Sequence, residues 1–423
     1  MTNSPTSLSH RPSTLLGLSS LFLVWLLSLC FYFHQYMFRI IPSIALPVMD
    51  EKGIAHLSSV QYNIALFIFW IAFVCFQPIA GIIINRLYYL FTLMSVLLLH
   101  VIAILLLAHS TAFYIISFSL LLMGFASSFS LVFSLFLAKK IFSQRFYPLA
   151  SGIIFGLGGA AAIFASLLFT PLSIQFGPIN ALELFAIIPS FLVLMMLTLL
   201  LIKLKQGKAI IYPLTPPQER SITSTTDKNN KNLSKSYLYV LFHGLPMVSF
   251  YSSWLLPFMS DKLGVSNLYA KSSTAAVFVG YIIGAPFAGW LTNLFYHSRS
   301  KLLTYVSGMG LIISLLVIYS PIDGALILLL LSFLGIVSGF IVTAVSITAD
   351  LAPTTKQSYA LSINSVCSNL GGALALLMIA GLFKWFDMST FYPDLKEFHI
   401  MLFLIPFSYS IAMCIGFSMI KNE

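Results

Sequence analysis

Long apolar runs separated by short polar breaks are the feature that most constrains this sequence. A helix needs about 20 apolar residues to cross a bilayer, and the chain of 423 residues contains twelve runs of this kind. Only 8% of the residues are charged, whereas a soluble domain carries about 25%. The runs do not alternate apolar and polar residues, which excludes a membrane β-barrel. The sequence therefore predicts an all-α integral membrane protein and excludes a water-soluble enzyme.

Polar, charged and Pro/Gly-rich breaks predict where each span begins and ends. The twelve predicted spans cover residues 15–47, 61–84, 91–109, 112–138, 149–171, 180–202, 237–258, 269–292, 302–320, 324–348, 359–382 and 399–420. The stretch between the sixth and seventh spans is rich in Ser, Thr, Asn, Pro and Lys, and it cannot bury enough apolar surface to fold alone. We therefore expect a tail at 1–14, a six-helix bundle at 15–202, a flexible linker at 203–236, a second six-helix bundle at 237–420 and a tail at 421–423.

The lysines and arginines predict the orientation of the chain, because short cytoplasmic loops accumulate Lys and Arg. With both termini in the cytoplasm, sixteen of the 22 basic residues lie on the cytoplasmic side and five on the outer side, with Arg39 inside the first span. The net charge of +10 is therefore explained by basic cytoplasmic loops, and no nucleic-acid partner is expected.

The two halves of the chain repeat each other. Residues 78–88 match residues 286–296, 123–129 match 334–340, and 157–160 match 370–373, at offsets of 208, 211 and 213. Each half has six predicted spans, an even number, so both halves cross the membrane in the same direction. Such parallel duplications place a substrate at the interface of the halves, near the bilayer midplane.

Four stretches of the sequence are similar to motifs of the major facilitator superfamily: residues 32–49, 76–81, 81–86 and 141–160. The resemblance extends over essentially the whole chain, and residues 32–49 resemble the first span of bacterial metabolite importers, which suggests a symporter of organic anions and protons. It implies the twelve-helix major facilitator fold and secondary active transport by alternating access. It also implies a monomeric, multi-pass protein of the bacterial inner membrane.

One motif departs from the superfamily pattern. The GxxxDR signature matches at Gly81 and Arg86, but Asn85 stands in the place of the acid. Asparagine can cap a helix but supplies no charge. With the second-half equivalents Gly289 and Asn293, these residues form the expected gate, resting on hydrogen bonds rather than ion pairs. The alternative is that Asn85 is a tolerated substitution without a role.

Arg39 is the most informative position for the substrate. A charge inside a span costs several kcal/mol unless it faces a wet cavity or a partner. Tyr32, Tyr36 and Arg39 are spaced to share one helical face, and Gln35 lies four residues before Arg39. No Asp or Glu lies in the middle of a span, so an unpaired arginine favours a small anionic substrate. The alternative is that Arg39 reaches the outer interface.

Further polar residues complete the expected substrate site on other spans. They are Gln77, Tyr251, Trp254, Asn364 and Asn369. The sequence contains no ATP-binding loop, cofactor motif or metal-ligand cluster, so we expect an ion or substrate gradient to drive transport.

Three titratable side chains are candidates for carrying a coupling proton. His34 and His243 lie on spans that the resemblance places beside each other across the pathway, and histidine titrates near neutral pH. His34 is favoured because it is close to Arg39 in the sequence. Glu183 is the third, although an acid at a helix start also compensates the helix dipole. The alternative for each histidine is a hydrogen-bonded packing role.

The leading hypothesis is a proton-coupled importer of a small organic anion, either a carboxylate-bearing metabolite or a polycarboxylate siderophore. A metabolite or drug exporter of the same fold is the first alternative, but exporters of cationic drugs need membrane-embedded acids that this sequence lacks. A non-transporting membrane sensor or a channel is the alternative from another class.

Overall fold

Helices make up nearly all of the described chain. The computed structural model describes residues 14–55, 57, 59–86, 89–205, 227–264, 268–385 and 395–420, and these ranges contain no strand. Most of both predicted tails and residues 206–226 of the predicted linker lie outside the described residues. The domain boundaries therefore remain predictions.

The first half contains seven helices that are apolar on nearly all sides, as expected for helices in a membrane. Two of them, α1 (Thr14–Met37) and α2 (Ile41–Glu51), share the first predicted span. The next five spans correspond to α3 (Ser59–Arg86), α4 (Tyr89–His109), α5 (Phe113–Ile141), α6 (Tyr147–Phe176) and α7 (Pro178–Lys205). Large apolar side chains such as Phe67 and Leu167 are 62% and 65% exposed, which suits contact with lipid.

The second half follows the same order of spans. Its elements are α8 (Asp227–Pro246), the π-helical segment η1 (Met247–Trp254), α9 (Leu255–Leu263), α10 (Leu268–Leu294), the short η2 (Tyr296–Ser298), α11 (Arg299–Tyr319), α12 (Gly324–Gly339), α13 (Ile341–Leu351), the short η3 (Thr354–Lys356), α14 (Gln357–Trp385), α15 (Leu395–Leu402) and α16 (Leu404–Ile420). Among the described residues, nine helices are long and apolar enough to cross a membrane, or ten when α1 and α2 count as one bent span. The predicted spans 237–258 and 359–382 are also helical, in α8–η1–α9 and in α14.

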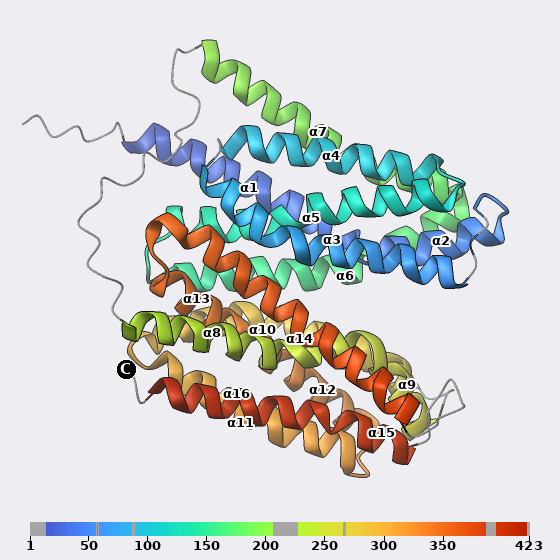
Figure 1. Ribbon diagram of the computed structural model, residues 1–423, viewed down its shortest axis with the longest axis vertical. Helices are drawn as coiled ribbons and strands as arrows, with labels where there is room; N and C mark the ends of the chain where they lie inside the picture. The colour runs from blue at the N-terminus through green and yellow to red at the C-terminus, as the bar shows by residue number, and fades with distance from the viewer. Residues whose placement is uncertain are drawn as a thin grey trace, which may run out of the picture.

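The helices form two bundles, α1–α7 and α8–α16 (Figure 1). The first residues of α1 and α8 and the last residues of α7 and α16 all lie at one end of the molecule. We call this the linker end, and the opposite end the far end. The halves meet where α3 packs on α14 and α6 packs on α10. The repeated motifs relate α3 to α10 and α6 to α14, so a two-fold rotation exchanges these two contacts, as a parallel duplication requires.

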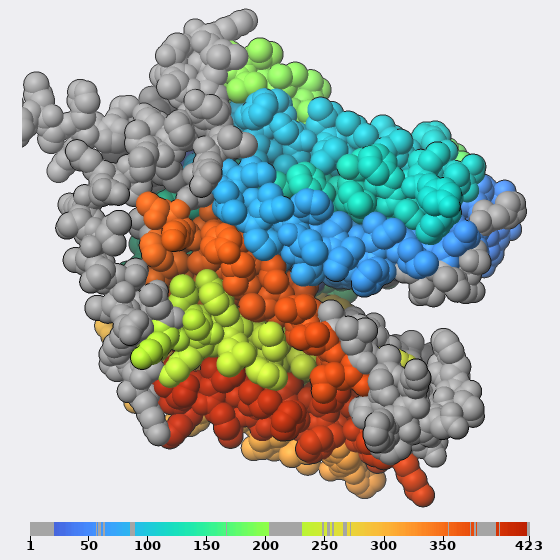
Figure 2. All heavy atoms as spheres, viewed as in Figure 1, coloured from blue at the N-terminus to red at the C-terminus, as the bar shows by residue number. Residues whose placement is uncertain are grey.

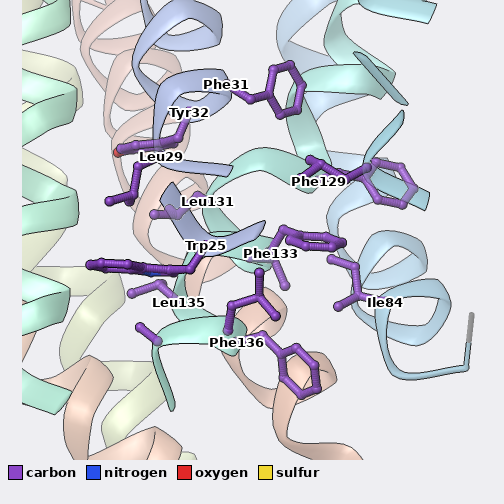
Figure 3. Close-up of a cluster of buried hydrophobic side chains, with 14 of the residues drawn as sticks. Trp25, Leu29, Phe31, Tyr32, Ile84, Phe129, Leu131, Phe133, Leu135 and Phe136 are labelled. Carbon is purple, nitrogen blue, oxygen red and sulfur yellow. The ribbon is translucent and has the colours of Figure 1, made fainter. Parts of the chain in front are cut away.

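Close packing of large side chains organises the first bundle (Figure 3). Trp25 and Phe31 from α1 and Phe129, Phe133 and Phe136 from α5 are at most 6% exposed. The indole Nε1 of Trp25 also donates to the carbonyl oxygen of Ser134, at 3.2 Å. Because lipid tails are as apolar as these side chains, dispersion contacts and such hydrogen bonds hold the helices together, rather than exclusion from water.

The first span of each half is interrupted. In the first half, α1 and α2 meet at 43°, and Arg39 lies in the turn between them, with its backbone N–H bonded to the carbonyl of Tyr36 at 3.2 Å. The predicted span 15–47 is thus helical on both sides of a turn at residues 38–40. In the second half, the π-helical segment begins directly after Pro246, at the equivalent place. Interrupted spans in corresponding positions of two halves point to a binding site between them.

Candidate functional site

A cavity of about 80 Å³ lies between the two halves, lined by side chains from both bundles. It has room for a small solute, since one water molecule needs about 10–15 Å³. Its polar lining consists of Tyr32, Tyr36, Arg39, His243, Tyr281, Ser338, Asn364, Ser365, Ser368 and Asn369. Arg39 is the one residue among these with a permanent charge, and the described lining contains no Asp or Glu. The cavity therefore has a positive formal charge.

The guanidinium of Arg39 is clamped between two aromatic rings. Its Cζ lies 4.2 Å from the ring centroid of Tyr36 and 4.3 Å from that of Phe73, on α3. The ring faces stabilise the cation. Two of its nitrogens, Nε and Nη2, are buried and have no hydrogen-bond partner among the described residues. A buried N–H without an acceptor is costly, so this arrangement is suited to binding an anion.

Phe73 was not identified from the sequence as a site residue. It lies four residues before Gln77, on the same face of α3, and this spacing was the available signal. The sequence contains many phenylalanines, 38 in all, so the spacing alone could not select this one.

Tyr32, Tyr36 and Arg39 meet at the cavity wall, as expected from the sequence, although Arg39 lies beyond the end of α1. Gln35 does not line it, although the sequence placed it on the same face. Its Oε1 accepts a hydrogen bond from the hydroxyl of Ser130 on α5, at 2.6 Å. The helical spacing between positions 35 and 39 fails because α1 ends at Met37 and the chain turns before Arg39.

The second half contributes amides from α14 to the cavity. Asn364 and Asn369 line it, as predicted. Asn364 Nδ2 donates to the hydroxyl of Thr348 at 2.8 Å, and Asn369 Nδ2 donates to the carbonyl of Ser365 at 2.8 Å. These bonds fix the orientation of both amides beside the cavity.

Three other predicted substrate residues lie outside the cavity lining. Gln77 bridges the halves, with Nε2 donating to the hydroxyl of Ser365 at 2.9 Å. The hydroxyl of Tyr251 lies 3.1 Å from that of Tyr409, and Trp254 packs on Phe398. The π-helical segment explains the last two positions, because its wider turn rotates residues after Met247 relative to a continuous α-helix.

The three candidate proton carriers lie in different parts of the structure. His243 lines the cavity, but His34 does not. His34 Nε2 lies 2.8 Å from the carbonyl oxygen of Phe185 on α7, and its ring packs at 5.5 Å against that of His100. Glu183 lies on the surface, 3.0 Å from His109 and 43% exposed. The two histidines are therefore not placed beside each other across the pathway.

Comparisons with known proteins agree with this fold. The family model of the Major Facilitator Superfamily matches residues 24–376 and, separately, residues 238–420. The chain belongs to the major facilitator superfamily. It is thus a multi-pass membrane protein with the major facilitator fold, in a family of secondary transporters.

Individual relatives of this transporter are distant. The fucose:proton symporter of E. coli aligns over 94% of this chain and 98% of its own, with a TM-score of 0.68 and 13% identity. A bacterial homologue of the iron transporter ferroportin aligns over 95% and 98%, with a TM-score of 0.66 and 13% identity. The multidrug resistance protein MdtG of Proteus mirabilis is 27% identical over 163 residues, which are 37% of this chain and 40% of that relative. The structural likenesses show the fold alone.

The transporter is closed at the linker end by contacts between its halves. The carboxylate of Asp350, at the end of α13, binds both Lys139 of α5 and Arg299 of α11; the Arg299 Nη1 to Asp350 Oδ2 distance is 2.8 Å. All three side chains are at most 12% exposed. Asp350 was missed in the sequence, although it is the repeat equivalent of Lys139 at the offset of 211. The ion pair between Lys139 and Asp350 therefore joins matching positions of the two halves.

Two glycines of the predicted gate allow the two halves to approach closely at the linker end. A Cβ at Gly81 would meet the backbone of Ser358 on α14, and a Cβ at Gly289 would meet the backbone of Pro148 on α6. The hydroxyl of Ser358 also donates to the carbonyl of Gly81 at 2.6 Å. Asn85 and Arg86 end α3, and their side chains lie outside the described residues; the Oδ1 of Asn293 is buried without a partner among those described.

Gly81→Ala is expected to reduce transport about tenfold while the protein still folds. Its Cβ would lie 2.9 Å from the Ser358 carbonyl oxygen and from Tyr359 Cα, and such overpacking costs about 1–3 kcal/mol, here against the closed linker end. Initial transport rates in proteoliposomes measure the effect. The control is Gly308→Ala, whose Cβ would have one neighbour within 4 Å, the flexible Met413 side chain at 3.3 Å. Equal rates for both variants would contradict this assignment.

Proposed function

We propose that this transporter imports a small organic anion together with protons, by alternating access. The observation that carries the proposal is Arg39, a cation at the wall of the cavity with two buried nitrogens that lack a partner in the described chain. A planar guanidinium binds a carboxylate through two parallel hydrogen bonds. Among the described residues, the cavity lining supplies no acid to neutralise Arg39. A carboxylate on the substrate would complete the ion pair.

We also propose a direction of transport, from the orientation of the chain. We propose that the linker end faces the cytoplasm of a bacterial inner membrane, because sixteen of 22 basic residues belong to that side. The halves touch at the linker end and are separated by a hollow toward the far end (Figure 2). In this orientation the cavity loads from outside. The ferroportin homologue is likewise described as outward-facing.

Proton coupling is proposed for His243, since it is the predicted titratable residue that lines the cavity together with Arg39. His34 contacts α7 instead, and Glu183 lies on the surface at the far end. The fold neighbour from E. coli is a proton symporter, so proton coupling is compatible with this architecture.

An exporter of drugs is the second candidate, because a multidrug resistance protein is a relative. Two features of the cavity favour the anion importer instead. Its volume of about 80 Å³ is below the roughly 300–1,000 Å³ of pockets for drug-sized ligands. Its charge is positive, which disfavours cationic drugs.

The proposal predicts saturable, gradient-driven uptake of small carboxylates. Proteoliposomes with an acidic exterior would be offered labelled monocarboxylates, dicarboxylates, a polycarboxylate siderophore, a neutral sugar and a cationic dye. We expect accumulation of at least one carboxylate, and its loss when a protonophore collapses the gradient. Transport of the dye or sugar alone would contradict the proposal, and non-saturable flux would indicate a channel.

A further inference from the structure

The imidazole of His243 has a partner at each ring nitrogen. Nε2 lies 3.1 Å from the carbonyl oxygen of Val337 on α12. A carbonyl only accepts, so Nε2 carries the hydrogen and donates it. Nδ1 lies 3.2 Å from the hydroxyl of Tyr239, one turn earlier on α8. In a neutral imidazole with a hydrogen on Nε2, Nδ1 is an acceptor, so the Tyr239 hydroxyl donates to it.

Tyr239 has a second acceptor within reach of the same hydroxyl. Its oxygen lies 3.3 Å from the carbonyl oxygen of Leu303 and 2.9 Å from the hydroxyl of Ser307, both on α11. A tyrosine hydroxyl has one hydrogen, so it bonds either to His243 or to Leu303 but not to both. The Ser307 hydroxyl can donate to the Tyr239 oxygen in either case. The site therefore has two complete hydrogen-bond arrangements, which differ by one rotation of the Tyr239 hydroxyl and by one proton on Nδ1.

We infer that Tyr239 is a positioning residue that allows His243 to hold a coupling proton. A proton arriving from the cavity binds Nδ1, which then donates to the Tyr239 oxygen, while the Tyr239 hydrogen turns toward Leu303. One proton is gained, no covalent bond between heavy atoms changes, and release reverses the rotation. Without this acceptor the imidazolium would be a buried cation with an unpaired N–H, which is costly. The inference rests on the proposed function, in which His243 takes the proton.

The surroundings of His243 support this assignment. The Tyr239 ring stacks on the imidazole at 5.1 Å with an interplanar angle of 17°, and the Tyr409 ring of α16 meets it edge-on at 5.6 Å. Tyr281 and Arg39 share the cavity wall with it, and α14 presents amides and serines there. No acid is among these described neighbours. The proton on His243 thus depends on neutral acceptors and on the arriving anion.

The test compares two tyrosines that touch the same imidazole. Tyr239→Phe keeps the stacked ring but removes the hydroxyl that contacts Nδ1. Tyr409→Phe is the matched control, because the Tyr409 hydroxyl contacts Tyr251 rather than His243. Hydrogen bonds to charged groups are worth more than neutral ones, by about 1 kcal/mol. For Tyr239→Phe we therefore expect gradient-driven accumulation about fivefold lower at neutral pH, with its half-maximal pH displaced by about 0.7 unit toward acid.

Counterflow exchange of substrate separates coupling from damage to the fold. We expect Tyr239→Phe to keep counterflow within about twofold of the unmodified protein, and Tyr409→Phe to keep both counterflow and the pH profile. Suppose that His243→Gln loses accumulation but Tyr239→Phe has an unchanged pH profile. This result would overturn the role of Tyr239 and leave the proposed proton role of His243 intact. If His243→Gln still accumulates substrate, the proposed proton role of His243 fails, and this inference fails with it. Loss of counterflow in Tyr239→Phe would assign the hydroxyl a structural role and also overturn it.

Discussion

Arg39→Ala is expected to reduce anion uptake by about 100-fold or more, while the protein still inserts and folds. Removing one member of a buried charge pair costs about 2–5 kcal/mol of binding, and Arg39 supplies the permanent charge of the cavity lining. Arg39→Lys should recover little, because an ammonium cannot make two parallel hydrogen bonds to a carboxylate or stack flat between Tyr36 and Phe73.

Initial uptake rates and substrate binding, measured on purified protein, would quantify the loss. Arg145→Ala is the matched control, since Arg145 is exposed at the linker end beside the start of α6. Near-normal uptake by Arg39→Ala would remove Arg39 from the site. A thermal stability equal to that of the unmodified protein would show that the loss arises from binding rather than from unfolding.

Asp350→Asn is expected to open the linker end and to lower transport strongly. The carboxylate is shared by Lys139 and Arg299, and its removal leaves two buried cations facing each other. Breaking a buried ion pair costs about 3–5 kcal/mol, enough to shift the balance between closed and open linker ends by about 100-fold. Lys139→Gln in the same protein removes one of the two cations, and we expect this double variant to recover part of the closed state.

Thiol labelling would detect the opening directly. In a background without the four native cysteines, Ser358→Cys places a thiol in the buried contact between α14 and Gly81. A membrane-impermeant maleimide supplied at the linker end should label it slowly in the unmodified gate and at least tenfold faster with Asp350→Asn. Equal labelling rates would show that the three charged residues do not control closure.

The sequence predicted the properties that depend on local composition. A span is recognised by its length and apolarity, so the twelve segments correspond to helices in the structure. The duplication was visible because the short motifs keep nearly one offset. Tyr32 and Tyr36 were grouped correctly at the cavity wall because helical spacing relates residues within one helix.

Tertiary structure decided which side chains from different helices meet. The turn at residues 38–40 directs Arg39 to the cavity and leaves Gln35 against α5, and the π-helical segment moves Tyr251 and Trp254 away from the lining. Phe73, Asp350 and Tyr239 gained their roles from contacts with Arg39, Arg299 and Leu303, which lie on other elements and which no spacing in the sequence relates to them. In a chain where nearly every helix is apolar on all sides, periodicity does not show which face points inward. That choice is made by close packing and by the few buried polar groups that must find partners.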